Sequence, residues 1–214
     1  MKKLVILFLS ITFSFNAIAQ NSDEAKTLLD EVSVKATSYD NISIDFKYVL
    51  ENTEENIKQE TKGDVVMEDD KYRLNILGIT RIYDGTKIYS ISPEDEEVTV
   101  SSGSDEDEST ITPSKMLSFY KEGFTYDMDI VQDVSGRKIQ FVKLIPIDSN
   151  SEIKYVLLGI DTKTKHIYRL IEIGKNSTKT TLTVNSFKTN EPLSKTLFTF
   201  DESKYEDYYI NKLD

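Results

Sequence analysis

Few residues of this chain could carry out chemistry, and the first candidate is its one histidine, His166. It lies in the polar run Lys163-Thr164-Lys165-His166, which is typical of a surface turn. A metal site would need further ligands at set spacings around it, and the sequence does not supply them. A serine–histidine–aspartate set, a nucleophile elbow and a phosphate-binding loop are also missing. We therefore predict a surface histidine and no catalytic residues.

The second group with possible chemistry is the acidic run Asp105-Glu106-Asp107-Glu108, inside a loop over residues 103–110. Such carboxylates could bind calcium, but the run lacks the alternating aspartates and the distant glutamate of a calcium loop. Paired carboxylates could also hydrolyse glycosides. However, the acids crowd into turns, and the chain has no tryptophan on which a sugar could stack. The pattern favours a solvated loop without metal or catalysis, and it leaves calcium binding open.

The N-terminus has the features of a cleavable export signal. Lys2 and Lys3 precede an apolar run over residues 4–15, and Ala17-Ile18-Ala19 is a small-x-small cleavage site. The run is too short for a membrane-spanning helix. We predict a signal peptide over residues 1–19 and a single domain over residues 20–214. Export without cysteine suits the periplasm of a Gram-negative bacterium.

Composition narrows the classes of partner. The chain has no cysteine, so it has neither disulfides nor thiolate metal sites. Its formal net charge of −11 repels the phosphates of nucleic acids and the anionic surface of membranes. The simplest interpretation of this charge is solubility. Nucleic acid is therefore excluded as a partner.

The remaining sequence predicts strands around two helices. Residues 21–39 form an amphipathic helix, with Ala25, Leu28, Leu29, Val32, Ala36 and Tyr39 on one face. Residues 114–122 form a short second helix after Thr112-Pro113. The polar stretch 51–62 is expected to be a long turn or a frayed hairpin end. Strands are expected over residues 41–50, 63–67, 71–77, 79–83, 87–91, 98–101, 139–145, 153–160, 167–173, 180–187 and 197–200.

The regular spacing of these strands predicts a mainly β (α+β) fold, namely an antiparallel barrel or strongly curved sheet of about ten to eleven strands. Asp84-Gly85 between apolar runs is a strong hairpin signal, because both turn positions need positive φ. The two helices must then lie across the sheet. They either cap an ordinary core or close one side of an open barrel above a cavity. Pattern alone does not decide between these arrangements.

An ordered set of short motifs resembles a known family. It comprises Asp45-Phe46-Lys47-Tyr48, Gly63, Lys71-Tyr72-Arg73, Tyr83-Asp84-Gly85-Thr86-Lys87-Ile88-Tyr89, Pro93, Val98-Thr99-Val100, Thr112-Pro113-Ser114-Lys115, Leu144-Ile145-Pro146 and Phe198-Thr199-Phe200-Asp201. Over nearly the whole mature chain, the sequence resembles the periplasmic outer-membrane lipoprotein carriers of the LolA family, especially those of Bacteroidetes. The resemblance implies an unclosed antiparallel barrel with a helical lid above an apolar cavity.

The resemblance also implies a function without catalysis or cofactor. Such a carrier binds acylated lipoproteins, receives them from an inner-membrane ATP-driven complex and passes them to an outer-membrane acceptor as a monomer. Two departures separate this chain from many relatives. Glu68-Asp69-Asp70 stands where those relatives have a basic residue linked to cargo transfer, and Tyr48 stands where they have glutamine. The nearest basic candidate for a gating role is Arg73.

Alternation along the strands and helices assigns residues to this expected cavity. The predicted wall consists of Phe46, Tyr48, Leu74, Ile76, Tyr89 and Ile91. The predicted lid consists of Leu28, Leu29, Val32, Met116, Leu117 and Tyr120. A register error of one residue would turn every wall residue outward.

Two other functions remain open at this stage. The chain could be a periplasmic sensor domain, or a carrier of other lipids, on the same fold. It could also be a hydrolase, which only the acid content favours.

Overall fold

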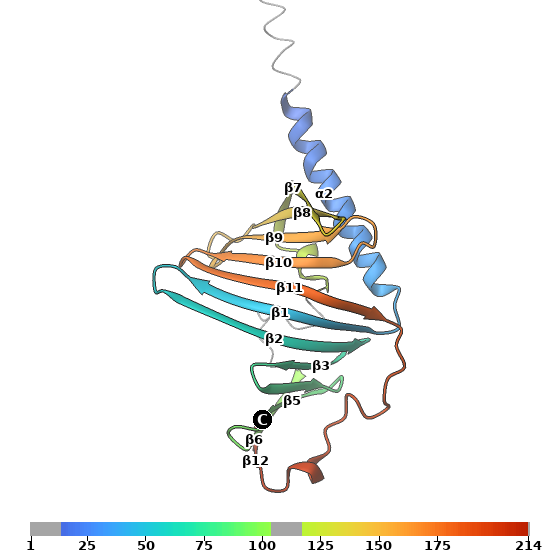
Figure 1. The fold of residues 1–214 in the computed structure, drawn as a ribbon, viewed down its shortest axis with the longest axis vertical. Helices are drawn as coiled ribbons and strands as arrows, with labels where there is room; N and C mark the ends of the chain where they lie inside the picture. The colour runs from blue at the N-terminus through green and yellow to red at the C-terminus, as the bar shows by residue number, and fades with distance from the viewer. Residues whose placement is uncertain (1–13, 104–116, 214) are drawn as a thin grey trace, which may run out of the picture.

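The computed structural model describes residues 14–103 and 117–213, and its strands form one twelve-stranded sheet. The strand order is β12-β6-β5-β4-β3-β2-β1-β11-β10-β9-β8-β7 (Figure 1). The strands are β1 Ile42–Asn52, β2 Ile57–Glu68, β3 Lys71–Ile76, β4 Ile79–Tyr83, β5 Lys87–Ser92, β6 Glu97–Ser102, β7 Phe124–Val134, β8 Arg137–Pro146, β9 Ile153–Asp161, β10 Ile167–Gly174, β11 Thr178–Thr189 and β12 Tyr209–Lys212.

The sheet does not close into a full barrel. Neighbouring strands pair antiparallel throughout, except that β12 runs parallel to β6. The edge strands β7 and β12 are not paired with each other. The single α-helix of the described residues, α2 (Ser14–Thr37), runs along the β7–β11 half of the sheet (Figure 1). The predicted fold class, an unclosed antiparallel sheet with a helical lid, is confirmed.

One face of the sheet, here called the inner face, carries the larger cores. Directly opposed residues of paired strands point to the same face. Register therefore places Ile44, Val65 and Leu74 on one face, and it places Tyr48, Leu182 and Leu170 on that same face. Helix α2 buries its apolar stripe against this inner face over β7–β10, through Ala25, Leu28, Leu29 and Val32.

A close approach between strands explains the glycine that begins the second predicted strand. Gly63 in β2 lies opposite Phe46 in β1 and Ile76 in β3. A Cβ atom built on Gly63 would lie 2.5 Å from the Phe46 ring and 2.7 Å from the carbonyl oxygen of Asn75. Glycine thus leaves room for the Phe46 ring to lie flat over β2 on the inner face.

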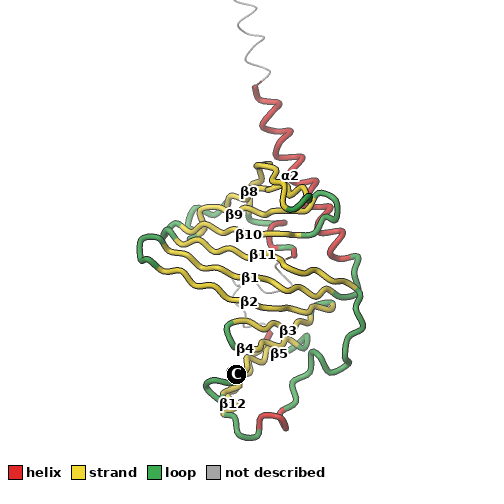
Figure 2. Tube along the Cα trace, viewed as in Figure 1, coloured by secondary structure: helices red, strands yellow, loops and turns green. Residues whose placement is uncertain are grey.

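A second core covers the opposite, outer face of β4, β5 and β6. Ile82, Ile91, Val98 and Val100 are buried there. The covering layer comes from the chain after β11, which passes the short 3-10 helix η4 (Glu202–Tyr205) and ends in β12 (Figure 2). Within this layer Phe200 stacks on Tyr89, with ring centroids 4.6 Å apart.

Two predicted segments differ from the structure in their secondary structure. The stretch 51–62 is mostly strand, and β1 and β2 continue on both sides of a tight turn at residues 53–56. Cross-strand ion pairs support these polar strands, with Lys47 Nζ 2.7 Å from Glu60 Oε1 and Lys58 Nζ 3.1 Å from Glu51 Oε1. The predicted strand 197–200 is wrong, because residues 197 and 198 lie in a turn and Phe200 packs onto the sheet instead of pairing in it.

The helices also differ from their predicted bounds. Helix α2 begins at Ser14, within the predicted signal peptide, and ends at Thr37. Residues 114–116 of the predicted second helix lie outside the described residues. The described remainder holds only the 3-10 helix η3 (Phe119–Lys121), and Glu122 is already extended. Gly123 follows with φ +80°, which ends the turn as expected of a glycine in this position.

Candidate functional site

The inner face contains a cavity of about 130 Å³. Its wall comes from β1, β2, β3, β10 and β11, and Leu117 closes it from the segment before η3. Apart from the hydroxyl group of Tyr48, the side chains of the wall are apolar. The lining residues are Ile44, Phe46, Tyr48, Val65, Met67, Leu74, Ile76, Leu117, Ile167, Leu170, Leu182 and Val184.

Four of the six predicted wall residues line this cavity, namely Phe46, Tyr48, Leu74 and Ile76. The other two, Tyr89 and Ile91, lie on the outer face. Tyr89 is opposite Ile82, and Ile82 is opposite Arg73, which is adjacent to Leu74 in β3 and so points the other way. The apolar residue of β5 that points inward is Ile88, which is 1% exposed.

The lid residues divide into two groups. Leu117 lines the cavity. Leu28, Leu29, Val32 and Tyr120 do not line it, and instead form a core with Ile167 and Leu170, whose side chains also border the cavity. Met116 lies outside the described residues. Helix α2 therefore supports one wall of the cavity, whereas Leu117 forms part of its lining.

Sequence reasoning missed seven of the lining residues. All of them lie on expected strands, and most follow the same alternation as the residues that were chosen. Their signal was present, because Ile44 precedes Phe46 by two positions and Val184 follows Leu182 by two. What was missing was the order of the strands, which brings β10 and β11 beside β1. The missed residues are Ile44, Val65, Met67, Ile167, Leu170, Leu182 and Val184.

The candidate gating residue does not reach this cavity. Arg73 pairs with Val66 and Ile82, so it points to the outer face. The acidic turn after β2 lies instead beside a hollow that adjoins the cavity. Asp69 and Asp70 line a separate hollow that shares Met67 and Leu117 with the cavity.

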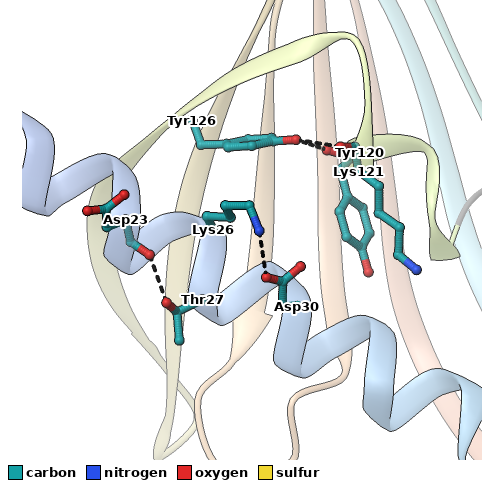
Figure 3. Close-up of polar contacts among 7 residues, drawn as sticks. All are labelled: Asp23, Lys26, Thr27, Asp30, Tyr120, Lys121 and Tyr126. Carbon is teal, nitrogen blue, oxygen red and sulfur yellow. Dashed lines mark hydrogen bonds and ion pairs between the residues drawn. The ribbon is translucent and has the colours of Figure 1, made fainter.

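Figure 3 shows polar contacts between η3 and β7 and within helix α2. The hydroxyl group of Tyr126 donates to the carbonyl oxygen of Tyr120, at 2.7 Å, and Lys26 pairs with Asp30 along the exposed side of α2, at 2.9 Å. The ring of Tyr120 is fully buried against the helix, and its hydroxyl group has no hydrogen-bond partner within the described parts of the chain. Burial raises the pKa of this hydroxyl group.

His166 is more enclosed than its polar surroundings in sequence predict. Its Nε2 lies 2.8 Å from the hydroxyl oxygen of Tyr39, and its ring stacks on Phe187 with centroids 4.0 Å apart. These contacts join the chain after α2 to β10 and β11. The predicted surface histidine is therefore a packing residue at the end of the helix.

Residues 14–103 and 117–213 contain neither a cluster of metal ligands nor a helix that could span a membrane. Histidine, aspartate and glutamate side chains do not gather there in groups of three that could hold a metal ion. The acidic run 105–108 lies outside those residues. Within the same part of the chain, α2 is not apolar enough along its length to cross a membrane.

A family model described as outer membrane lipoprotein carrier protein LolA matches residues 37–201. The chain belongs to the LolA family. The match begins at the end of α2 and includes all strands that line the cavity. No curated protein matches the sequence.

Solved structures with little sequence identity superpose on this LolA-family chain to different extents. An uncharacterised conserved protein from Thermus thermophilus superposes with a TM-score of 0.57 at 10% identity, over 89% of this chain and 99% of its own. A putative outer membrane lipoprotein-sorting protein domain from Vibrio parahaemolyticus gives 0.48 at 10% identity, over 87% and 100%. A LolA superfamily protein from Nitrosomonas europaea gives 0.44 at 10% identity, over 83% and 98%.

Membership of the LolA family and an apolar cavity together indicate a carrier that binds lipids or lipoproteins. Asp69 and Asp70, which form the turn between β2 and β3, lie near this cavity.

Proposed function

We propose that this protein is a periplasmic carrier that binds the acyl chains of lipoproteins and carries them from the inner to the outer membrane, without catalysis. The observation that supports this most directly is the apolar cavity on the inner face of a LolA-family sheet. Aliphatic and aromatic walls favour hydrocarbon, because apart from the Tyr48 hydroxyl group they offer no polar group that would have to be desolvated. The export signal expected over residues 1–19 would deliver the carrier to the periplasm.

The cavity must enlarge before it can hold this cargo. A volume of about 130 Å³ is close to that of a cavity that accommodates one benzene ring. A complete acyl chain needs more space, so Leu117 must move outward when cargo binds. In the closed state Leu117 shields part of the apolar wall from water. Cargo then replaces lid contacts, which lowers the net affinity and allows release.

Energetics require partners at both membranes. Each buried CH₂ contributes about 0.8 kcal/mol, so a membrane holds one long acyl chain by roughly 10 kcal/mol. A soluble carrier cannot extract a chain held this strongly at a useful rate. We therefore propose that an inner-membrane ATP-driven complex loads the carrier and that an outer-membrane acceptor unloads it.

The test is the mass of what remains bound to the protein purified gently from its own periplasm. Native mass spectrometry should find acylated polypeptide on the wild type and on Leu77→Glu, whose site is 65% exposed on a hairpin. Leu117→Glu should lose the cargo, because a charge would enter the apolar cavity. Lipid alone, an unacylated polypeptide, no cargo, or full cargo on Leu117→Glu would each overturn the proposal.

A further inference from the structure

A carboxylate stands on the inner face just beyond the apolar cavity. Glu172 in β10 lies opposite Val156 in β9 and Thr180 in β11. Two residues earlier on the same strand, and therefore on the same face, is Leu170, which lines the cavity. A step of two residues along a strand covers about 7 Å. The carboxylate thus lies within the length of a small polar head group from the cavity wall.

Glu172 has no partner in the part of the chain that the structure describes. Its side chain is partly buried, and it makes neither a hydrogen bond nor an ion pair there. Burial raises its pKa, and no nearby cation offsets this effect. Glu51, near the same end of the sheet but on the outer face, has two lysine partners, Lys58 at 3.1 Å and Lys179 at 3.3 Å.

The fold itself gives no reason for an unpaired carboxylate in this position. Partial burial of a charged group costs free energy unless a partner compensates for it. A glutamine would fill the same volume without a charge. Two hydroxyl residues also lie on this part of the inner face, namely Thr180, opposite Glu172, and Thr61, opposite the lining residue Tyr48. The inner face therefore changes from apolar to polar at one end of the cavity.

We propose that Glu172 binds the primary ammonium group of an amphiphile whose acyl chains occupy the adjacent cavity. This proposal rests on the proposed function and adds the identity of the head group. An ammonium group would supply the missing counter-charge and a charge-assisted hydrogen bond. Two sources share this chemistry, namely a diacylated lipopeptide with a free α-amino group and a phospholipid with an aminoethyl head group.

Competition between matched ligands tests the proposal. The probes are a synthetic diacylated lipopeptide with a free α-amino group and its N-acetylated counterpart, mixed in equal amounts and counted by native mass spectrometry. The wild type should carry the free amine about tenfold more often, the factor expected for one charge-assisted hydrogen bond. Glu172→Gln should carry both forms equally and should keep its affinity for the N-acetylated form.

The net charge of −11 attracts any cation, so the control must remove a charge elsewhere. Asp45→Asn does so at an exposed position of β1, adjacent to Phe46 but on the outer face, and it should keep the tenfold preference. A second pair, phosphatidylethanolamine and its N-acetyl derivative, separates the two sources. Preference in the lipopeptide pair alone assigns the site to a peptide terminus, and preference in both pairs assigns it to ammonium groups in general.

Several outcomes would overturn the inference. Equal binding of both forms by the wild type, or a preference that survives in Glu172→Gln, removes Glu172 from head-group recognition while the carrier function stands. A preference lost equally in Asp45→Asn would assign it to overall charge. If the wild type binds none of the four probes, the carrier function fails as well.

Discussion

At the scale of single residues, His166 shows how a side chain gains its role from segments distant in sequence. Its partner Tyr39 is 127 positions away, and the ring on which it stacks belongs to β11. Burial, followed by repulsion from Lys35, lowers the pKa of His166, and the attraction of Asp161 opposes this. The folded chain therefore binds fewer protons at this site than the unfolded chain does.

The lowered pKa of His166 leads to a prediction about how the stability of the fold depends on pH. The contribution of neutral His166 is present above its ordinary pKa of 6.5 and is lost as pH falls from 6.5 towards its lowered folded pKa. At pH 7.5, His166→Gln should reduce the free energy of unfolding by about 1 kcal/mol, through the lost hydrogen bond and ring stacking. Urea denaturation should show the gap between variant and wild type narrowing at pH 5.5. A gap of constant size would mean that His166 does not titrate in this range.

Alternation in the sequence predicted cavity-lining residues of β1 and β3 correctly, but the two residues it indicated in β5 do not line the cavity. Phe46, Tyr48, Leu74 and Ile76 follow the pleat of strands whose bounds were nearly right, and all four line the cavity. Tyr89 and Ile91 alternate equally well, yet they point to the other face. Alternation gives two faces without saying which is inner, and the choice for β5 depends on a covering segment more than 100 residues away.

At the scale of elements, helix α2 and Leu117 contribute differently to the cover of the sheet. Helix α2 packs beside the cavity, and Leu117 lines it. The amphipathic stripe of α2 was readable from helical spacing, and its buried residues match that stripe. The second helix was not readable in the same way. Its described part is a three-residue 3-10 turn, because apolar spacing over so few residues does not specify an α-helix against tertiary contacts.

Cross-linking can show which of these elements moves. Lys165 Nζ lies 2.5 Å from Glu31 Oε2, so cysteines at these two positions would tie α2 to the β9–β10 turn through a short bis-maleimide. The chain has no cysteine of its own, so the reagent would react only there. If α2 has to move away from the sheet to admit lipid, the cross-link should slow uptake of a fluorescent lipid about tenfold or more. The reason is that blocking this movement raises the free-energy barrier to uptake.

The matched control for this experiment lies within the helix. Lys26→Cys with Asp30→Cys places the same linker along α2, where the native side chains are 2.9 Å apart, and should leave uptake unchanged. Unchanged uptake in the α2-to-sheet cross-link would instead assign the opening movement to the segment that carries Leu117.

At the scale of the whole molecule, one sheet serves two cores on opposite faces. The inner face of β1–β3, β10 and β11 surrounds a cavity, whereas the outer face of β4–β6 carries a separate core under the C-terminal segment. Sequence patterns predicted the curved sheet and its helical cover. They did not predict the second core, because a chain segment of mixed polarity that lies flat on a sheet has no periodicity of its own.

This division predicts that stability and cargo binding can be changed separately. Ile91 is 2% exposed in the packed outer core, so Ile91→Ala should lower the free energy of unfolding by about 2–5 kcal/mol and leave lipid affinity unchanged. Leu74 already borders empty space, so Leu74→Ala should cost less stability, below about 2 kcal/mol, because fewer contacts are lost. Its effect should appear as altered affinity for acyl chains of different length. Urea denaturation and lipid titration of both variants provide the comparison, and a change in affinity for Ile91→Ala would show that the two cores are coupled.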